Sequence, residues 1–305
     1  MSRPEILILS SGIPAPTRAA LAERFACHGP DGDIDAILAA HGPRIQGIAC
    51  HGKDRIDVAM LDRLPNLKAV ACMTAGTDAI DDVALAARGI PLHTSSYTLA
   101  DDVADIAIAL LVMARRRLVQ ADAHLRSGAW SAAPFPLQRT IAGRRLGLLG
   151  VGHLGQAIAK RAEAMGVAIR YSARRARPEW AWPFHADPVS LAADSDMMIV
   201  CCTGGPANHG LVGAAAFAAL GPEGTLVNVS RGEVLDEPAL IAALASGALG
   251  AAGLDVYCNE PTPDARFAGL PNVVLLPHVG SATVETRAAM AWSVVTALEA
   301  ALLGG

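Results

Sequence analysis

A short apolar strand candidate that runs into a glycine-rich turn and then a helix constrains this chain more than any other feature. Arg145–Leu149 is the strand candidate, Gly150-Val151-Gly152-His153-Leu154-Gly155 is the turn, and Gln156–Met165, closed by Gly166, is predicted as the helix. The first glycine permits a tight turn, the second lets the backbone approach a pyrophosphate, and the third lets helix and strand pack closely. Another strand, predicted over Val167–Tyr171, follows where a βαβ unit requires one. The pattern predicts a doubly wound parallel sheet that binds a dinucleotide through Gly150, Gly152 and Gly155.

The end of the second strand indicates which dinucleotide this turn binds. An NAD site usually places Asp or Glu there, where it accepts hydrogen bonds from the ribose hydroxyls. This chain instead reads Tyr171-Ser172-Ala173-Arg174-Arg175-Ala176-Arg177. Guanidinium groups suit a 2′-phosphate, so the segment favours NADPH. A solvated basic turn without a ligand is the alternative.

Three polar side chains follow apolar runs in the carboxyl-terminal part of the chain. Arg231 follows the run Thr225–Val229, Glu260 follows Ala251–Val256, and His278 follows Val273–Leu276. In an open α/β sheet the carboxyl ends of the strands face the ligand crevice. We therefore expect a cation, a carboxylate and an imidazole to face the same small molecule.

The residue types in this set suggest a reduction chemistry. A guanidinium holds a carboxylate and its neighbouring carbonyl with paired donors, so Arg231 would orient the substrate. An imidazole exchanges protons near neutral pH, and a carboxylate on its far nitrogen fixes the tautomer and raises the pKa. His278 would then be the acid and Glu260 its tuner. Taken singly, each residue also has a structural interpretation, as a turn residue or a helix cap.

Strand and helix candidates alternate along the chain, which predicts a parallel α/β fold. Helices are predicted over Thr17–Phe25 and Val83–Ala87, from a capping-box-like start at Thr98–Asp101 to about Arg117, and over Val284–Leu303. Strand candidates in the first part of the chain are Glu5–Leu9, Gly47–Cys50, Ala69–Met73 and Pro91–His93.

This pattern predicts two domains. A Rossmann-type doubly wound dinucleotide-binding domain, residues 98–284, is expected to be inserted into a smaller flavodoxin-like α/β substrate domain, residues 1–97 and 285–305. The ligand cleft is expected between them. A length of 305 residues, 52% of them hydrophobic, suffices for two cores of ordinary size.

Charge and hydropathy argue against large polyanionic or lipid partners. The formal net charge of −4 gives no general attraction to nucleic acid or an anionic membrane. The longest apolar stretch, Ile106–Met113, ends before Arg115-Arg116-Arg117. It is shorter than the roughly 18 residues that a membrane span needs. We expect no nucleic-acid and no membrane partner.

The cysteines and the amino terminus suggest a location. Six cysteines are scattered without metal-ligand spacing, which favours reduced thiols and predicts no metal site. Met1-Ser2-Arg3-Pro4 and the short run after it lack the layout of a signal peptide. We expect a cytoplasmic protein.

Taken together, these residues resemble a known family. The chain resembles the D-isomer-specific 2-hydroxyacid dehydrogenases, and most closely the branch of NADPH-dependent glyoxylate/hydroxypyruvate reductases and plant hydroxyphenylpyruvate reductases. The similarity covers nearly the whole length. Its segments are Leu64–Lys68, Ala75–Asp78, Asp101–Asp105, Val229–Gly232, Gly253–Val256 and Leu276–Ser281.

The resemblance implies roles for individual residues. The family's catalytic Arg, Glu and His fall on Arg231, Glu260 and His278. Substrate contacts would come from Ala75, Gly76, Arg231, His278 and Ser281. Cofactor contacts would come from Gly150, Gly152, His153, Leu154, Gly155 and Gln156 around the pyrophosphate, from Ala173, Arg174 and Arg175 at the 2′-phosphate, and from Cys202, Val229, Asp255, His278 and Gly280 elsewhere along the dinucleotide. The loop Thr203-Gly204-Gly205-Pro206 departs from the family pattern, so no contact is predicted there.

The expected activity is therefore reduction of a small 2-oxoacid, such as glyoxylate or hydroxypyruvate, to the D-2-hydroxy acid by hydride transfer from NADPH. Two alternatives stay open. One is a dinucleotide-sensing corepressor, which shares the fold and the triad. The other is an NAD-linked member such as a phosphoglycerate dehydrogenase, which Arg174, Arg175 and a chain ending at Gly305 without a regulatory domain disfavour. A homodimer is expected from the apolar helix Ile106–Val112 and the segment around Trp130, and partly from what the resemblance implies.

Overall fold

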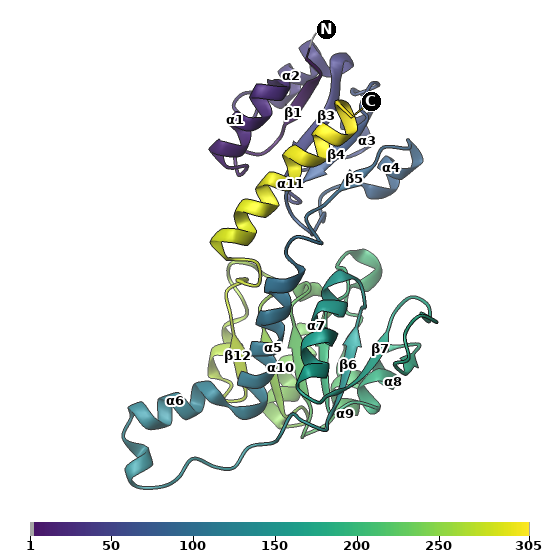
Figure 1. The fold of residues 1–305 in the computed structure, drawn as a ribbon. Helices are drawn as coiled ribbons and strands as arrows, with labels where there is room; N and C mark the ends of the chain where they lie inside the picture. The colour runs from purple at the N-terminus through teal and green to yellow at the C-terminus, as the bar shows by residue number, and fades with distance from the viewer. Residues whose placement is uncertain (1–2, 305) are drawn as a thin grey trace. The chain divides into compact units, whose positions relative to one another are not determined.

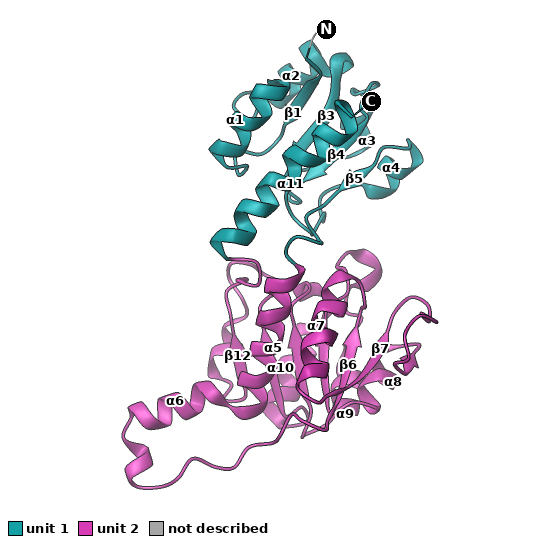
Figure 2. Cartoon of the chain, in the orientation of Figure 1, with its two compact units in different colours: residues 1–99, 283–305 teal, residues 100–282 magenta. Residues whose placement is uncertain are grey.

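The computed structural model describes residues 3–304, and the chain divides into two compact units (Figures 1 and 2). Unit 1 comprises residues 1–99 and 283–305, and unit 2 comprises residues 100–282. In sequence, unit 2 is thus an insertion into unit 1. Each unit has its own parallel sheet and its own hydrophobic core.

The sheet of unit 1 has the strand order of flavodoxin-like folds. Its order is β2-β1-β3-β4-β5, and every neighbouring pair is parallel. This confirms the predicted flavodoxin-like α/β fold of the smaller domain. The strands are β1 Glu5–Ile8, β2 Ala26–His28, β3 Ile45–Cys50, β4 Ala69–Cys72 and β5 Leu92–His93.

The core of unit 1 lies on both faces of this sheet because side chains alternate along each strand. Ile6 and Ile8 pack with Val294 of the last helix on one face, whereas Leu7 packs with Leu38 of α2 on the other. The predicted terminal helix is present as α11, which is capped by the Thr283 side chain. The helices are α1 Ala15–Arg24, α2 Ile34–His41, α3 Val58–Leu61, α4 Asp82–Ala87 and α11 Val284–Leu302, with a short 3-10 turn, η1, at Gly42–Arg44.

The sheet of unit 2 is doubly wound. Its order is β12-β11-β10-β9-β6-β7-β8 with all pairs parallel, so the winding direction reverses between β6 and β9, where ligands bind in such sheets. This confirms the predicted Rossmann-type sheet. The strands are β6 Arg145–Leu149, β7 Ala168–Ser172, β8 Phe184–His185, β9 Met197–Val200, β10 Thr225–Asn228, β11 Ala251–Leu254 and β12 Val273–Leu275.

Helices cover both faces of this second sheet (Figure 1). Leu191, Phe217 and Leu240, from α8, α9 and α10, join one buried cluster with the strands, while α5 and α7 pack against each other. The helices are α5 Ala100–Arg116, α6 Leu118–Arg126, α7 His153–Ala164, α8 Pro188–Ala193, α9 Ala214–Leu220 and α10 Glu237–Ser246, with 3-10 turns η2 Ala129–Ser131, η3 Pro206–Asn208, η4 Gly232–Val234 and η5 Ala265–Gly269. None of the helices described has the length and apolarity to span a membrane.

Two sequence expectations differ from the structure. The helix after the glycine turn begins at His153, not at Gln156, because extended Gly152 is its N-cap and the third glycine already belongs to its first turn. The predicted set of strands also lacked β2, β8 and β9. Strands β2 and β8 span only three and two residues, which is too short for a period-2 pattern to be recognised.

Candidate active site

The glycine turn after β6 has two glycines fixed by packing and one open to solvent. At Gly150 φ is +99°, and an added Cβ would lie 2.6 Å from the Cα of Cys202. At Gly155 an added Cβ would lie 2.3 Å from the carbonyl oxygen of Gly150. Both positions therefore exclude a side chain. At Gly152, by contrast, an added Cβ would meet nothing within 4 Å, so the backbone there is accessible to a ligand.

The helix that follows this turn begins without a side-chain cap. Gly152 is the N-cap of α7 and has no side chain to accept from the first N–H groups of the helix. Aligned N–H groups and the helix dipole make such an end a phosphate-binding site. Of the predicted pyrophosphate contacts, His153, Leu154, Gly155 and Gln156 form this first turn.

The end of β7 places two arginines in solvent. Arg174 and Arg175 are exposed, and neither is in an ion pair among residues 3–304. Arg177 differs, because it lies 3.3 Å from the Glu179 carboxylate and stacks over Trp180 at 5.6 Å. The Tyr171 hydroxyl accepts from the Arg177 N–H at 2.7 Å and shapes the turn. The end of β7 thus carries an accessible cationic turn, formed by Ala173, Arg174 and Arg175. It lies beside β6, the strand that leads into the glycine turn.

The three predicted catalytic residues follow three neighbouring strands. Arg231 follows β10, Glu260 follows β11 and His278 follows β12, and these strands are adjacent in the sheet. Because all three run parallel, their carboxyl ends meet at one edge. The predicted cofactor contacts Cys202 and Val229 follow β9 and β10 at the same edge.

Arg231 is held by a short local network. Its side chain is half-buried, and its guanidinium donates to the Ser230 carbonyl at 2.8 Å. The Asn228 side chain donates to the Arg231 carbonyl at 2.9 Å and accepts from the Ser230 N–H at 3.0 Å. The backbone that carries the guanidinium is therefore fixed at the end of β10.

Glu260 and His278 are in direct contact. The Nδ1 atom of His278 lies 2.8 Å from the Oε2 atom of Glu260, while the other carboxylate oxygen accepts from the Tyr257 N–H at 3.2 Å. The histidine side chain is 43% exposed, so the imidazole stays accessible although Nδ1 is occupied. His278 also has a φ of +53°, a left-handed conformation that a non-glycine residue adopts only at some cost.

Asp255 holds the turn that carries His278. Its carboxylate is buried and accepts from the N–H groups of Val279 at 2.8 Å and Gly280 at 2.9 Å. Burial raises the pKa of Asp255, and these two hydrogen bonds oppose that rise. A Cβ at Gly280 would lie 2.9 Å from the same carboxylate. The sequence analysis expects a cofactor contact at Asp255 but does not predict its hydrogen bonds to the His278 turn. The one sequence feature that points to a structural role is an acidic residue directly after a buried strand.

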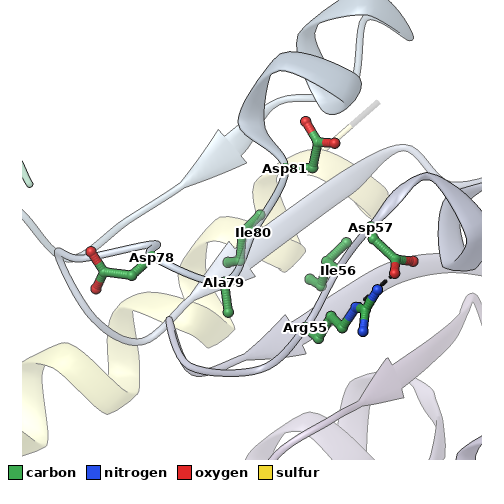
Figure 3. Close-up of a pocket in the computed structure, with 7 residues that line it drawn as sticks. All are labelled: Arg55, Ile56, Asp57, Asp78, Ala79, Ile80 and Asp81. Atoms are coloured by element: carbon green, nitrogen blue, oxygen red, sulfur yellow. Dashed lines mark hydrogen bonds and ion pairs between the residues drawn. The ribbon is translucent and has the colours of Figure 1, made fainter. Parts of the chain in front are cut away.

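The remaining predicted substrate contacts occupy loops. Ala75 and Gly76 follow β4 in unit 1, where the Thr74 hydroxyl donates to the Gly76 carbonyl at 2.8 Å. Ser281 follows Gly280 in unit 2. A separate hollow of about 400 Å³ in unit 1 contains none of the predicted site residues (Figure 3); it is lined by Arg55, Ile56, Asp57, Asp78, Ala79, Ile80 and Asp81.

Comparison with known proteins agrees with this geometry. Residues 108–280 match the sequence model described as D-isomer specific 2-hydroxyacid dehydrogenase, NAD binding domain. A hydroxyphenylpyruvate reductase of Plectranthus scutellarioides is 39% identical over 88% of this chain and 86% of its own. A 2-ketogluconate reductase of Gluconobacter oxydans is 40% identical over 96% and 94%.

A solved structure is similarly close. The NADPH-dependent glyoxylate/hydroxypyruvate reductase of Sinorhizobium meliloti, in complex with NADP and malonate, superposes with a TM-score of 0.85 at 39% identity, covering 98% of this chain and 93% of the other. The family model spans more than half of the chain, and the relatives cover nearly all of it. The chain therefore belongs to the D-isomer specific 2-hydroxyacid dehydrogenases.

Proposed function

We propose that this protein reduces a small 2-oxoacid to the D-2-hydroxy acid, with NADPH as the electron donor. The observation that carries the proposal is the contact between His278 Nδ1 and the Glu260 carboxylate, at a strand end adjacent to that of Arg231. A proton donor beside a carboxylate-binding cation is what this reaction needs. The D configuration rests on membership of the family.

The dinucleotide fits the residues of unit 2. The accessible backbone at Gly152 and the uncapped start of α7 suit a pyrophosphate, and exposed Arg174 and Arg175 suit a 2′-phosphate. When bound, NADPH supplies the hydride. The relative from Sinorhizobium meliloti, which is described as NADPH-dependent, supports this choice of cofactor.

The chain's own side chains would supply binding and the proton. Arg231 would bind the substrate carboxylate through paired donors. His278 would donate its proton from Nε2 to the carbonyl oxygen, because Nδ1 is engaged by Glu260. Glu260 would stabilise the imidazolium without touching the substrate. Ala75, Gly76 and Ser281 remain predicted substrate contacts.

The names of the relatives narrow the choice of substrate. Glyoxylate and hydroxypyruvate are our first candidates, while 2-ketogluconate and a hydroxyphenylpyruvate are the substrates named by two relatives. We also propose that the protein is a homodimer, since the exposed side chains of Leu125 and Trp130 lie on a segment of unit 2 that extends from its sheet. The free thiol state of all six cysteines supports a cytoplasmic location.

A panel of 2-oxoacids tests the proposal. NADPH oxidation would be followed with glyoxylate, hydroxypyruvate, 4-hydroxyphenylpyruvate and 2-ketogluconate, and the products would be resolved by chiral chromatography. We expect turnover of at least one substrate, with a D product. A dinucleotide sensor would bind NADPH yet reduce none of them, and an NAD-linked enzyme would turn over faster with NADH.

A further inference from the structure

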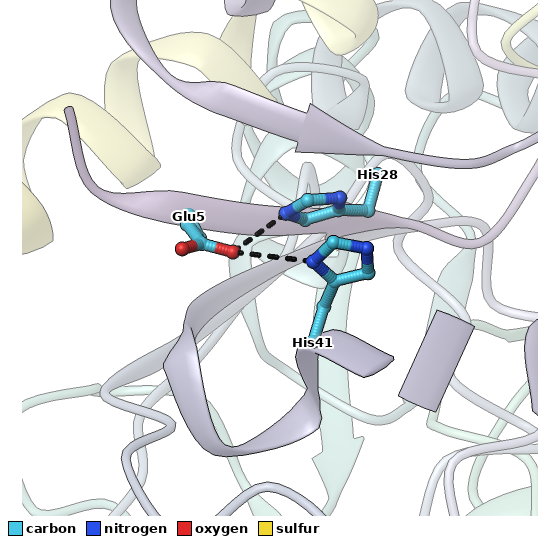
Figure 4. A group of neighbouring side chains, drawn as sticks. All are labelled: Glu5, His28 and His41. Carbon is cyan, nitrogen blue, oxygen red and sulfur yellow. Dashed lines mark hydrogen bonds and ion pairs between the residues drawn. The ribbon is translucent and has the colours of Figure 1, made fainter. Parts of the chain in front are cut away.

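Two imidazoles and a carboxylate meet at the edge of the unit 1 sheet, outside the candidate active site (Figure 4). Glu5 begins β1, His28 ends the edge strand β2, and His41 ends α2. The parallel register pairs Glu5 with Ala26 and Leu7 with His28, so Glu5 and His28 point to the same face of the sheet. That face is the one on which α2 packs.

The three donor atoms are close enough to share one ion. Glu5 Oε2 lies 2.7 Å from His28 Nε2 and 3.7 Å from His41 Nδ1, and all three lie within 4.8 Å of one another. In a tetrahedral zinc site with bonds of ~2.0–2.1 Å, neighbouring donor atoms are ~3.3 Å apart. The separations of 2.7 Å and 3.7 Å lie on either side of ~3.3 Å. Small side-chain movements would therefore bring the three donor atoms to the spacing of a zinc site. The two rings are stacked, with centroids 3.9 Å apart, which keeps both nitrogens beside the carboxylate.

We propose that Glu5, His28 and His41 form a binding site for a single zinc ion. Two imidazoles and one carboxylate are a donor set that zinc accepts, with water in the fourth position. The side chains of Glu5, His28 and His41 are 21%, 18% and 34% exposed, so solvent reaches the cluster. Ligands 23 and 36 residues away from Glu5 in sequence carry no recognisable spacing, which is why the sequence predicted no metal.

Arg44 competes with the ion and also prepares the site. It donates to the other oxygen of Glu5, Oε1, at 2.7 Å, and this bond can persist when Oε2 binds zinc. It also lies 2.7 Å from His41 Nδ1, and a guanidinium can only donate there. In this contact Nδ1 of His41 accepts through the lone pair that a metal ion would use. Zinc binding has to break two bonds: the contact between Arg44 and His41, and the hydrogen bond between His28 Nε2 and Glu5 Oε2, whose proton is released to solvent. The Arg44 side chain is 56% exposed and able to move.

Zinc titration of the full-length protein, prepared without a polyhistidine tag, tests the site. Calorimetry should report one saturable zinc per chain, and Co²⁺ should give the visible absorption bands of a tetrahedral site. His28→Ala and His41→Ala should each weaken zinc binding by roughly 10-fold or more. Arg44→Ala should tighten it, because the competing cation is gone. A loss of folding cannot produce that gain in affinity.

Two controls separate this site from other imidazoles. His93→Ala removes an exposed histidine of the same unit, and His278→Ala removes the one paired with Glu260; neither should change the zinc stoichiometry. Zinc should also raise the Tm of the wild type and of His278→Ala, but not that of His41→Ala. Binding that is absent from the wild type, or that persists undiminished in both His28→Ala and His41→Ala, would overturn the proposal.

Discussion

The contact of Glu260 with Nδ1 of His278 gives the two nitrogens of the imidazole different tasks. With Nδ1 held at 2.8 Å from the carboxylate, Nε2 is the nitrogen left to donate a proton. His278 has a left-handed φ. Asp255 accepts hydrogen bonds from the two N–H groups that follow His278 in the chain, which holds the backbone of this turn in one conformation. Local strain retained beside a titratable side chain is typical of functional sites.

Glu260→Gln tests this division of tasks. The amide keeps the shape but removes the anion that stabilises the imidazolium, which is the donating form. The kcat of the variant should fall, by no more than the roughly 10²–10⁴-fold that general acid catalysis contributes, while its affinity for NADPH stays close to that of the wild type. Glu285→Gln, which neutralises an exposed carboxylate on α11, serves as the control and should keep the kcat of the wild type. An unchanged kcat in Glu260→Gln would refute the role of Glu260.

The exposed arginine pair after β7 governs the predicted choice of cofactor. Replacing Arg174 and Arg175 by Ala should lower kcat/KM for NADPH. The decrease should correspond to about 1–3 kcal/mol of transition-state binding free energy, the scale of lost charge-assisted hydrogen bonds. Turnover with NADH should barely change. Arg177→Ala is the matched control with a smaller expected effect, because Arg177 already contacts Glu179 and Trp180. Equal kcat/KM for NADPH and NADH in the wild type would contradict this reading.

At the scale of elements, the sequence predicted strand ends better than helix starts. Apolar runs before Arg231, Glu260 and His278 correspond to β10, β11 and β12, because buried parallel strands have few polar residues. The sequence pattern predicts the start of α7 three residues late because Gly155 is a poor helix former. In the structure Gly155 packs closely on Gly150, a contact that the local sequence does not contain. Two features could not be predicted because they depend on contacts between segments that are distant in sequence. They are the hydrogen bonds of Asp255 to the His278 turn and the cluster of Glu5 with two histidines.

An ion-pair network at the amino ends of β6 and β9 links these elements. Arg145 lies 2.9 Å from the carboxylate of Asp194 and 3.2 Å from that of Asp196, and Arg170 lies 3.0 Å from Asp194. Burial raises the pKa of both aspartates, but the hydrogen bonds and charges of the arginines outweigh it, so both pKa values are lowered. A lowered folded-state pKa means stability that is present above the unfolded value and is lost as pH falls through the folded one.

Arg145→Met should therefore destabilise unit 2 in a pH-dependent way. We expect a loss on the order of 1 kcal/mol at pH 7, because the pair is partly exposed. The loss should be smaller at an acidic pH below the lowered folded-state pKa values of Asp194 and Asp196, where both carboxyl groups are protonated. Urea unfolding at both pH values measures the difference. Arg55→Met, which breaks a largely exposed pair with Asp57, is the control. A loss for Arg145→Met that is the same at both pH values would mean that packing, not charge, explains it.

The segment from α6 to η2 suggests that the protein associates with a second copy of itself. Leu118, Val119, Leu125 and Trp130 are exposed along this segment, and Leu137 is exposed just after it. Exposed apolar side chains that lie close together mark interaction surfaces. Light scattering should report twice the chain mass of 31.4 kDa at micromolar concentration. Trp130→Glu should shift the equilibrium toward the monomer. A wild type that scatters as a monomer would refute the dimer.

The most direct test of the proposed activity compares wild type and His278→Ala at neutral pH. NADPH oxidation would be measured with the best 2-oxoacid of the panel, and NADPH binding would be measured in parallel by fluorescence. We predict that the wild type turns over, and that His278→Ala loses roughly 10²–10⁴-fold in kcat while its affinity for NADPH stays close to that of the wild type. A variant that keeps most of its kcat with an unchanged pH profile would show that His278 is not the proton donor.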